Sequence, residues 1–472
     1  MSRRLSVFIK NFSYTLTSNF VSFIVSTLLI LVVPKLIGVQ AYGYWQYYLF
    51  YSSYVGFFHF GWIDGIYLRY GGAKYKDLNK ELFFSQFYML FFSQLLISII
   101  ISIFSIVFIR DGDKIFIFQM IALCLISMNL RYMLLYILQS TNRIKENARI
   151  TLIDRLLYCL IIVIFLSVGF RDYKSMIVAD LIGKLISLFF SMYYCKEIVF
   201  RKISTFHLEL KETYLNISVG IKLMIATIAS TLILGVVRFG IERSWDVSTF
   251  GKVSLTLSIS NLLMLFINAL GIIMYPVLKR TDQKKLPHIY KMMRTFLTVF
   301  LLGLLLLYYP FRSVLNYWLP QYTDSLMYMA FVFPMCVYEG KMSLLINTYF
   351  KALREEKLML IINLISLIVS IIITIFTTVV FRNLDLAVVS IVLLVAFKCI
   401  LSEILLSRRL NISIGKDIIL ELFLTIVFIV TGYFLNSWSS IMLYIIAFIM
   451  YLIVKRKDII STAENVKFFL KT

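Results

Sequence analysis

Long apolar stretches recur along almost the whole of this chain, and they constrain its fold more than any other feature. An apolar helix of ~20 residues crosses the hydrocarbon core of a bilayer, and we find about fourteen stretches of that kind. The sequence therefore predicts an all-α, polytopic membrane protein. The predicted spans are residues 12–36, 42–66, 82–109, 115–138, 151–169, 174–195, 216–238, 249–275, 288–312, 324–349, 357–381, 385–407, 417–435 and 438–454.

The distribution of positive charge predicts how these spans are oriented. The formal net charge of +22 would also suit a nucleic-acid partner, but that interpretation requires the basic residues to gather on one soluble face. Instead, most lysines and arginines outside the spans fall in alternate loops, such as 279–285 and 455–457. This is the positive-inside pattern. It predicts a multi-pass protein of the inner, cytoplasmic membrane, with both termini cytoplasmic, in contact with anionic membrane lipids and without a nucleic-acid partner.

A weak internal repeat predicts the domain organisation. Tyr42-Gly43 after the first span corresponds to Phe250-Gly251 after the seventh, and "LLYILQSTNRIKE" from Leu134 resembles "LLINTYFKALREE" from Leu344, each ~210 residues apart. We expect two pseudo-symmetric six-helix lobes, residues 1–195 and 216–407, followed by spans 13 and 14 with a cytoplasmic tail, residues 408–472. Transporters are often built from such repeats, with the substrate path between them.

Residues 196–215 connect the two lobes. They mix Lys196 and Arg201 with Val199 and Phe200, which is typical of an amphipathic helix on a membrane surface. We therefore predict an amphipathic cytoplasmic connector.

Cysteine spacing and nucleotide motifs give no sign of a cofactor. The five cysteines lie in or at the ends of spans without metal-ligand spacing, and the sequence contains no GxxxxGK[ST] loop. We expect neither a metal nor another cofactor.

One helical hairpin carries a recognisable pattern. From Leu36 to Gly72 the sequence places Gly38, Tyr42-Gly43, Gly61, Asp64-Gly65 and Arg69 in order. This stretch resembles the first hairpin of the polysaccharide and O-antigen flippases, which belong to the multidrug, oligosaccharidyl-lipid and polysaccharide exporter superfamily. The segments "ILQSTNRIKENARI" after the fourth span and "YPVLKR" after the eighth are also similar to that group.

The resemblance implies a flippase and not an enzyme. Its cargo would be an undecaprenyl-diphosphate-linked oligosaccharide, the repeat unit of O-antigen in lipopolysaccharide, of capsule or of exopolysaccharide. The protein would move it from the inner to the outer leaflet by alternating access, together with other polysaccharide assembly proteins. Each sugar hydroxyl taken unpaired into hydrocarbon costs several kcal/mol, so a polar path is needed. An inside-negative potential favours outward movement of the diphosphate by ~2.3 kcal/mol per charge per 100 mV, so net flipping would need no ATP.

Basic side chains within the spans are the candidate cargo-binding residues, because an ionisable residue at mid-bilayer is costly and usually functional. Arg131 and Lys222 have no acidic residue within two turns of their own helix, whereas Lys184 can pair with Asp180. These cations could line a cavity for diphosphate or acidic sugars.

The repeat adds two further candidates. Lys341 lies one repeat interval after Arg131, and Lys398 lies one interval after Lys184. Two basic pairs at matching depths would suit an anion path. In the alternative interpretation, these residues form inter-helix ion pairs with acidic side chains, namely Asp64, Asp154, Asp180, Glu339 or Glu403.

Other polar residues in the spans suggest gating or proton movement. Asp64 and Arg69 belong to the family-like turn, and with Asp180 they are candidates for a gating or structural role. His59 is the only histidine inside a span, away from its ends, and could relay a proton. The alternative is a histidine that hydrogen-bonds to a neighbouring tyrosine or serine.

Three other functions remain open. A cation-coupled small-molecule exporter of the same superfamily would favour an acidic cavity. A peptidoglycan-precursor flippase would predict an arginine in the first span, where we find only Ser, Thr, Asn and Tyr among polar residues of the membrane interior. A membrane polysaccharide polymerase would need catalytic residues in a large outer loop, and the predicted outer loops are short.

Overall fold

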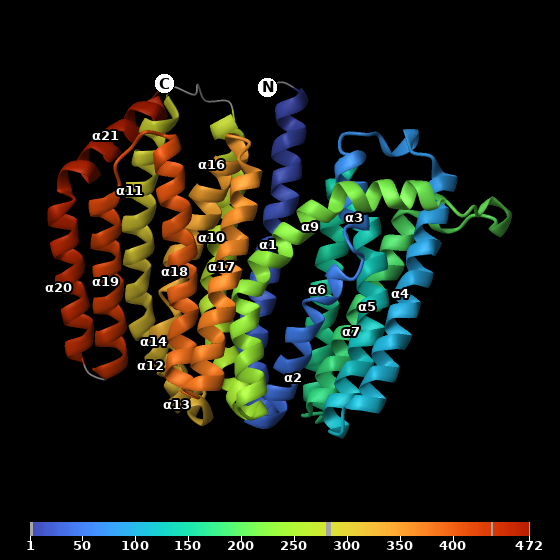
Figure 1. Ribbon diagram of the computed structural model, residues 1–472, viewed down its shortest axis with the longest axis horizontal. Helices are drawn as coiled ribbons and strands as arrows, with labels where there is room; N and C mark the ends of the chain where they lie inside the picture. Colours follow the sequence, from blue (N-terminus) through green and yellow to red (C-terminus); the bar gives the residue numbers. More distant parts are fainter. Residues whose placement is uncertain (1–2, 280–284, 436–437, 472) are drawn as a thin grey trace. The chain divides into compact units, whose positions relative to one another are not determined.

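The computed structural model describes the backbone of residues 3–279, 285–435 and 438–471. The side chains of residues 1–13, 15–16, 265–284, 436–438, 463 and 465–472 lie outside this description. Every regular element in the described backbone is helical, as Figure 1 shows. The contacts divide the chain into two compact units, Met1–Ile228 and Ala229–Thr472. This is the all-α, multi-pass membrane fold that the sequence predicts.

The first unit holds the helices of the first six predicted spans. They are α1 (Arg3–Ile37), α2 (Val39–Ser52), η1 (Val55–Phe57), α3 (Trp62–Arg69), η2 (Tyr75–Asp77), α4 (Lys80–Phe108), α5 (Gly112–Ser140), α6 (Ile144–Val168), α7 (Tyr173–Tyr194), α8 (Lys196–Val199), η3 (Ile203–Thr205) and the first half of α9 (Leu210–Ser244).

The second unit begins within α9 and holds the remaining helices. They are α10 (Val247–Lys279), α11 (Leu286–Leu304), η5 (Leu305–Leu307), α12 (Tyr308–Trp318), η6 (Pro320–Tyr322), α13 (Thr323–Leu326), α14 (Met329–Val332), α15 (Met335–Lys341), the π-helical η7 (Met342–Ile346), α16 (Asn347–Ala352), α17 (Glu356–Thr374), the π-helical η8 (Ile375–Val380), α18 (Leu384–Arg409), α19 (Gly415–Phe434), α20 (Trp438–Val454) and α21 (Arg456–Lys471).

Polar caps explain where several spans begin. The first amide groups of a helix have no partner within the helix, and an Asn or Asp side chain at the cap accepts from them. Asn79 caps α4, Asp111 caps α5, Asp172 caps α7 and Asn383 caps α18 in this way. Short polar loops therefore separate long apolar helices, and the boundaries fall close to the predicted ones.

One helix lies at the centre of each unit. In the first unit α5 packs against α2, α3, α4, α6 and α7, and 72% of its most apolar window is buried, against 22% for α4. In the second unit the segment Met329–Ala352 is 89% buried, and its α15 packs against α10, α11 and α18. The central helices therefore correspond to predicted spans 4 and 10, which the repeat relates.

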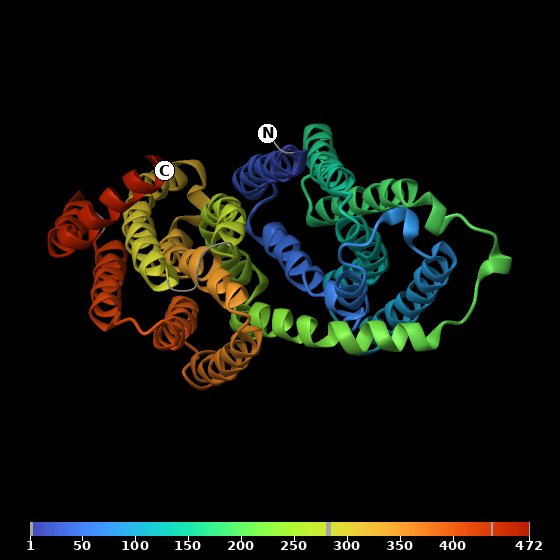
Figure 2. The ribbon, with the colours of Figure 1, turned by 90° about the horizontal axis from the view of Figure 1, so that it is seen from above.

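The packing partners repeat in the same way within each unit. Helix α6 packs on α7 as α17 packs on α18, and α4 packs on α5 as α11 packs on α15. Figure 2 also shows α1 beside α6 in the first unit, as their contacts require. Large apolar side chains on the outer faces, such as Leu96 and Ile103 of α4, are exposed. In a chain this apolar, such faces are lipid-contacting surfaces.

The number of continuous spans differs from the fourteen predicted. Among the described residues, eleven helices are long and apolar enough to cross a membrane, or twelve if the bent pair formed by residues 439–454 and 456–462 is one span. The predicted span 42–66 is broken into α2, η1 and α3. The predicted span 249–275 corresponds to α10, whose later side chains lie outside the description.

The predicted amphipathic helix over 196–215 is not formed as one helix. The segment contains α8, η3, irregular backbone and the first turns of α9. Its apolar side chains Ile198 and Val199 are buried in the core of the first unit, and Arg201 pairs with Glu81 at the start of α4 at 2.8 Å. Tertiary contacts with α4 therefore replace the surface helix that the mixed composition suggested.

Two glycine positions bring α3 and α9 into direct backbone contact within the first unit. A Cβ atom added to Gly65 would overlap the Asn216 carbonyl, and one added to Gly220 would overlap the Gly61 carbonyl. In both cases the obstacle is backbone, which cannot rotate away. Small residues permit this kind of close helix approach in membrane proteins.

We expect Gly220→Ala to lower stability, because overpacking a tight contact typically costs about 1–3 kcal/mol. The thermal midpoint of the purified protein in detergent, followed by size-exclusion chromatography, measures the effect. Gly112→Ala is the control, since a Cβ there meets nothing within 4 Å. Equal midpoints for the two variants would show that α3 and α9 are not in contact through these glycines.

Candidate functional site

A break in the helical backbone of the first unit creates a polar site at membrane depth. Between α2 and α3 the chain turns through Phe60 and Gly61, whose φ angles of 52° and 84° are left-handed. Unwound backbone within a membrane must find internal partners. The Asn129 side chain donates to the Val55 carbonyl at 3.0 Å, and Gln94 donates to the Phe58 carbonyl at 3.1 Å.

This break places His59 beside Asp64. The Gly61 amide donates to His59 Nδ1 at 3.1 Å, so the neutral ring carries its proton on Nε2. That atom lies 3.8 Å from Asp64 Oδ2. His59 is 7% exposed, and the Asp64 side chain is 14% exposed. Both residues line a cavity of about 290 Å³ together with Tyr132 and Tyr136. The predicted relay residue and the predicted gating acid therefore share one cavity.

Arg69, the other residue of the family-like turn, anchors α3 to α9. Its guanidinium binds Glu212 through Nη1 at 2.7 Å and Nη2 at 3.3 Å, and also reaches Asn216 Oδ1 at 2.5 Å. The Tyr70 hydroxyl donates to Glu212 at 2.9 Å, and burial together with this bond raises the pKa of Tyr70 to about 12. These contacts connect α3 to α9 and have a structural role. A gating role for Arg69 stays a prediction.

Two predicted cations of the first unit have carboxylate partners. Lys184 pairs with Asp180 one turn earlier on α7, and the Tyr48 hydroxyl donates to the same carboxylate at 2.6 Å. Arg131 on α5 donates through Nη2 to Asp154 of α6 at 3.1 Å. Its Nε is buried without a hydrogen-bond partner. Arg131 is therefore neutralised by one single-point contact, which leaves donor capacity unused.

Lys222 differs from these two residues. It is exposed on α9, and within the described part of the chain it makes no hydrogen bond or ion pair. Its charge is available to an anion.

The second unit contains a buried network of four charged residues. Lys341 Nζ lies 2.8 Å from Glu403 and 2.5 Å from Glu421. Arg294 Nε lies 2.6 Å from the same Glu403, and its Nη2 lies 2.6 Å from Glu421. All four side chains are at most 3% exposed. Two cations and two anions thus neutralise one another across α11, α15, α18 and α19.

Lys398 is buried like Lys341, but its environment is different. It is 6% exposed, and its ammonium donates to the Ser230 hydroxyl at 2.8 Å. Among the side chains that the structure describes, no carboxylate lies within ion-pair distance of it. Lys398 is therefore a buried cation whose charge has no described counter-ion.

Sequence reasoning missed Arg294 and Glu421. Arg294 lies within the predicted span 288–312, near its start. Its position two turns inside that span was the available signal. Glu421 lies at a similar depth in a span outside the repeat, so nothing related it to Lys341. The predicted partner Glu339 makes no ion pair among the described residues, whereas Glu403 does.

We expect Lys341→Met to destabilise the protein strongly, because removing one partner from a buried ionic network leaves a charge uncompensated and typically costs about 3–5 kcal/mol. The thermal midpoint in detergent measures this loss. The matched control is Lys351→Met, an exposed lysine, and Glu421→Gln added to Lys341→Met should recover part of the loss. A Lys341→Met protein as stable as the control would exclude the network as a stabilising element.

Comparison with known proteins extends these observations. No protein-family model matches the sequence, and no curated protein matches it. Solved structures do match. An inward-facing multidrug resistance MATE family transporter of the MOP superfamily is 12% identical, with 82% of this chain and 94% of that chain covered and a TM-score of 0.60.

Two further solved structures match this chain over similar lengths. The lipid II flippase MurJ in an inward closed conformation is 15% identical, with 95% and 99% covered and a TM-score of 0.61. A MOP superfamily transporter from Pyrococcus furiosus is 12% identical, with 85% and 96% covered and a TM-score of 0.52. Identities this low show the fold alone. The chain therefore has the fold of MOP-superfamily transporters, the superfamily that its first hairpin resembles.

Proposed function

We propose that this protein is a flippase that carries an anionic, lipid-linked oligosaccharide across the membrane by alternating access. The observation that carries the proposal is Lys398, a buried intramembrane cation without a described carboxylate partner. Burying a charge without a counter-ion costs several kcal/mol. An anion that arrives with the cargo, such as the diphosphate of undecaprenyl-diphosphate, would supply the missing counter-ion.

Two more cations support an anionic cargo. Lys222 is exposed on a spanning helix and unpaired in the described structure, and Arg131 has a buried Nε without a partner. Ammonium and guanidinium groups form the strongest hydrogen bonds with phosphate oxygens. In contrast, Lys184 and Lys341 are neutralised by carboxylates, so we assign them structural roles.

The fold is compatible with such a cargo. A protein with this fold is a lipid II flippase. The fold can therefore carry lipid-linked cargo. For the Pyrococcus furiosus transporter, reversed polarity of the binding pocket suggests a different function. In this chain, the unpaired cations disfavour the cationic cargo of a drug exporter. The likeness to transporters also argues against the polymerase alternative.

We further propose that His59 and Asp64 bind a coupling proton. The two side chains line one cavity of about 290 Å³, and His59 Nε2 lies 3.8 Å from Asp64 Oδ2. Tyr132, Tyr136 and Thr227 also line this cavity, so a water molecule in it would have polar partners. Histidine is the side chain whose charge changes most readily near neutral pH. A proton held between the imidazole and the carboxylate would couple transport to a pH gradient.

We expect Lys398→Met and Lys222→Met each to slow export by about 10-fold or more, because a hydrogen bond to a charged group is worth about 1.5–3 kcal/mol. The measurement is accumulation of undecaprenyl-diphosphate oligosaccharide in the inner leaflet of a deletion strain that expresses each variant at wild-type level.

Two controls separate cargo contact from structural effects. Lys398→Arg keeps the charge and should retain most of the export, and Lys202→Met removes an exposed lysine of the connector and should leave export unchanged. Wild-type export by the Lys222→Met, Lys398→Met double variant would rule out these residues as cargo ligands.

We expect His59→Gln to remove the dependence of transport on an imposed pH gradient, because glutamine keeps the hydrogen-bonding capacity and cannot titrate. Proteoliposomes with equal protein content and opposite gradients provide the measurement, and His288→Gln, an exposed histidine, is the control. The proton proposal fails if His59→Gln responds to the gradient as the wild type does.

A further inference from the structure

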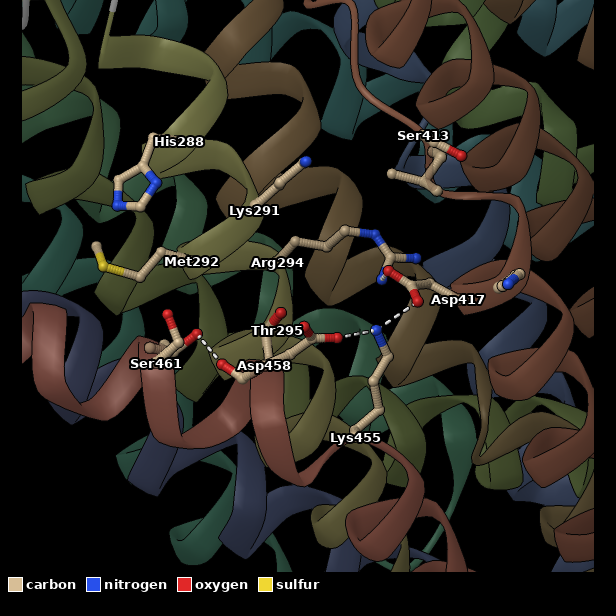
Figure 3. Close-up of a pocket in the computed structure, with 13 residues that line it drawn as sticks. His288, Lys291, Met292, Arg294, Thr295, Ser413, Asp417, Lys455, Asp458 and Ser461 are labelled. Atoms are coloured by element: carbon tan, nitrogen blue, oxygen red, sulfur yellow. Dashed lines mark hydrogen bonds and ion pairs between the residues drawn. The ribbon is translucent and has the colours of Figure 1, made fainter.

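A polar hollow of about 320 Å³ lies at one end of the helices of the second unit. It is bordered by the first turns of α11, the loop between α18 and α19, and the junction of α20 with α21. Figure 3 shows Lys291 extending from α11 toward the loop that carries Ser413, with Lys455 and Asp458 on the far wall. All of its lining residues belong to the second unit, and Lys398 is not among them.

The floor of the hollow is closed by ion pairs. Arg294 Nη1 lies 3.2 Å from Asp417, and Lys455 pairs with both Asp417 and Asp458, the latter at 2.7 Å. Both acidic side chains of the hollow are therefore already neutralised. An incoming anion would meet no free carboxylate there.

The rim of the hollow carries two lysines with unused charge. Lys291 and Lys416 are exposed, and neither makes a hydrogen bond or ion pair with any residue that the structure describes. The hydroxyl groups of Ser413 and Ser461 also line the space without a described partner. Two ammonium groups with neighbouring hydroxyls are a typical donor set for a phosphate group.

The position of the hollow matches the level of lipid head groups. Helix α21 is bent by 68° from α20 and packs across the start of α11 (Figure 1). The hollow therefore lies where spanning helices end and a transverse helix begins. The charge pattern of the sequence predicts that this is the cytoplasmic side, where anionic lipids attract basic residues.

Exposed apolar side chains on the three helices that border the hollow favour a lipid over a soluble anion. Ile419, one turn beyond Lys416 on α19, is 67% exposed, and Phe296 on α11 is 64% exposed. Ile460 on α21 is 56% exposed. A phospholipid contacts apolar surface of these helices in addition to the polar groups of the hollow, whereas inorganic phosphate uses the polar groups alone.

We propose that this hollow binds the phosphate head group of an anionic phospholipid, with Lys291 and Lys416 as its ligands. The bound lipid joins α11, α19 and α21. Asp417 pairs with Lys455 in the hollow and with Arg294, which belongs to the buried network with Glu403 and Glu421. Lipid binding in the hollow therefore stabilises the second unit as a whole. A ligand that binds only the folded state raises stability in proportion to the logarithm of its concentration.

The thermal midpoint of the full-length protein in a neutral detergent tests the proposal, with phosphatidylglycerol, phosphatidylcholine or inorganic phosphate added at equal concentration. Native mass spectrometry counts the retained lipids. We expect phosphatidylglycerol alone to raise the midpoint, and we expect its apparent affinity to fall at least 10-fold in the Lys291→Gln, Lys416→Gln double variant.

The matched control is the Lys351→Gln, Lys357→Gln double variant, which removes the same charge from exposed lysines of the same unit. It should bind phosphatidylglycerol as the wild type does. An equal loss in both double variants would mean that only overall charge attracts the lipid, and this would overturn the proposal. Stabilisation by inorganic phosphate equal to that by phosphatidylglycerol, with the same dependence on Lys291 and Lys416, would overturn the assignment to a lipid.

Discussion

The absence of water in the hydrocarbon core governs this structure, because each polar group at membrane depth must find its partner within the protein. Helices satisfy the backbone almost everywhere. The break between α2 and α3 is the informative exception, since Asn129 of α5 and Gln94 of α4 bind the carbonyls that the helix leaves free. Asn129 also donates to Gln94 at 2.7 Å. The hydrogen bonds of Asn129 and Gln94 therefore stabilise the turn that brings His59 beside Asp64.

The same constraint acts on charged side chains, and it separates residues that the repeat treats as equivalent. Arg131 and Lys341 lie on the two central helices of their units. Arg131 meets one carboxylate, on a neighbouring helix of the repeat. Lys341 meets two, and one of them, Glu421, comes from α19, which lies outside the repeat. Helix α19 thus gives Lys341 a second carboxylate partner, whereas Arg131 in the first unit has only one.

Lys184 and Lys398 show the opposite pattern. Lys184 has Asp180 one turn earlier, whereas the position one turn before Lys398 is the buried Leu394. One unit therefore neutralises its lysine locally, and the other leaves the charge without a described counter-ion. Because burial without compensation is costly, this asymmetry distinguishes a structural cation from a candidate ligand for cargo. The rim lysines of the α11–α19–α21 hollow are uncompensated too, but they are exposed at a helix end, where lipid phosphate is the available anion.

The sequence by itself determined the membrane class, the helical architecture and most span boundaries, because apolar length and helix caps are local properties. It also identified Lys222 as a cation without a nearby acid on its own helix, and it identified Lys398 as a candidate through the repeat. Only the tertiary structure decided that the span 42–66 is broken, that residues 196–215 pack on α4, and that Lys341 shares two carboxylates with Arg294. Those outcomes depend on which helices are neighbours and how each is rotated, and no local pattern encodes contacts between residues as distant as Lys341 and Glu421.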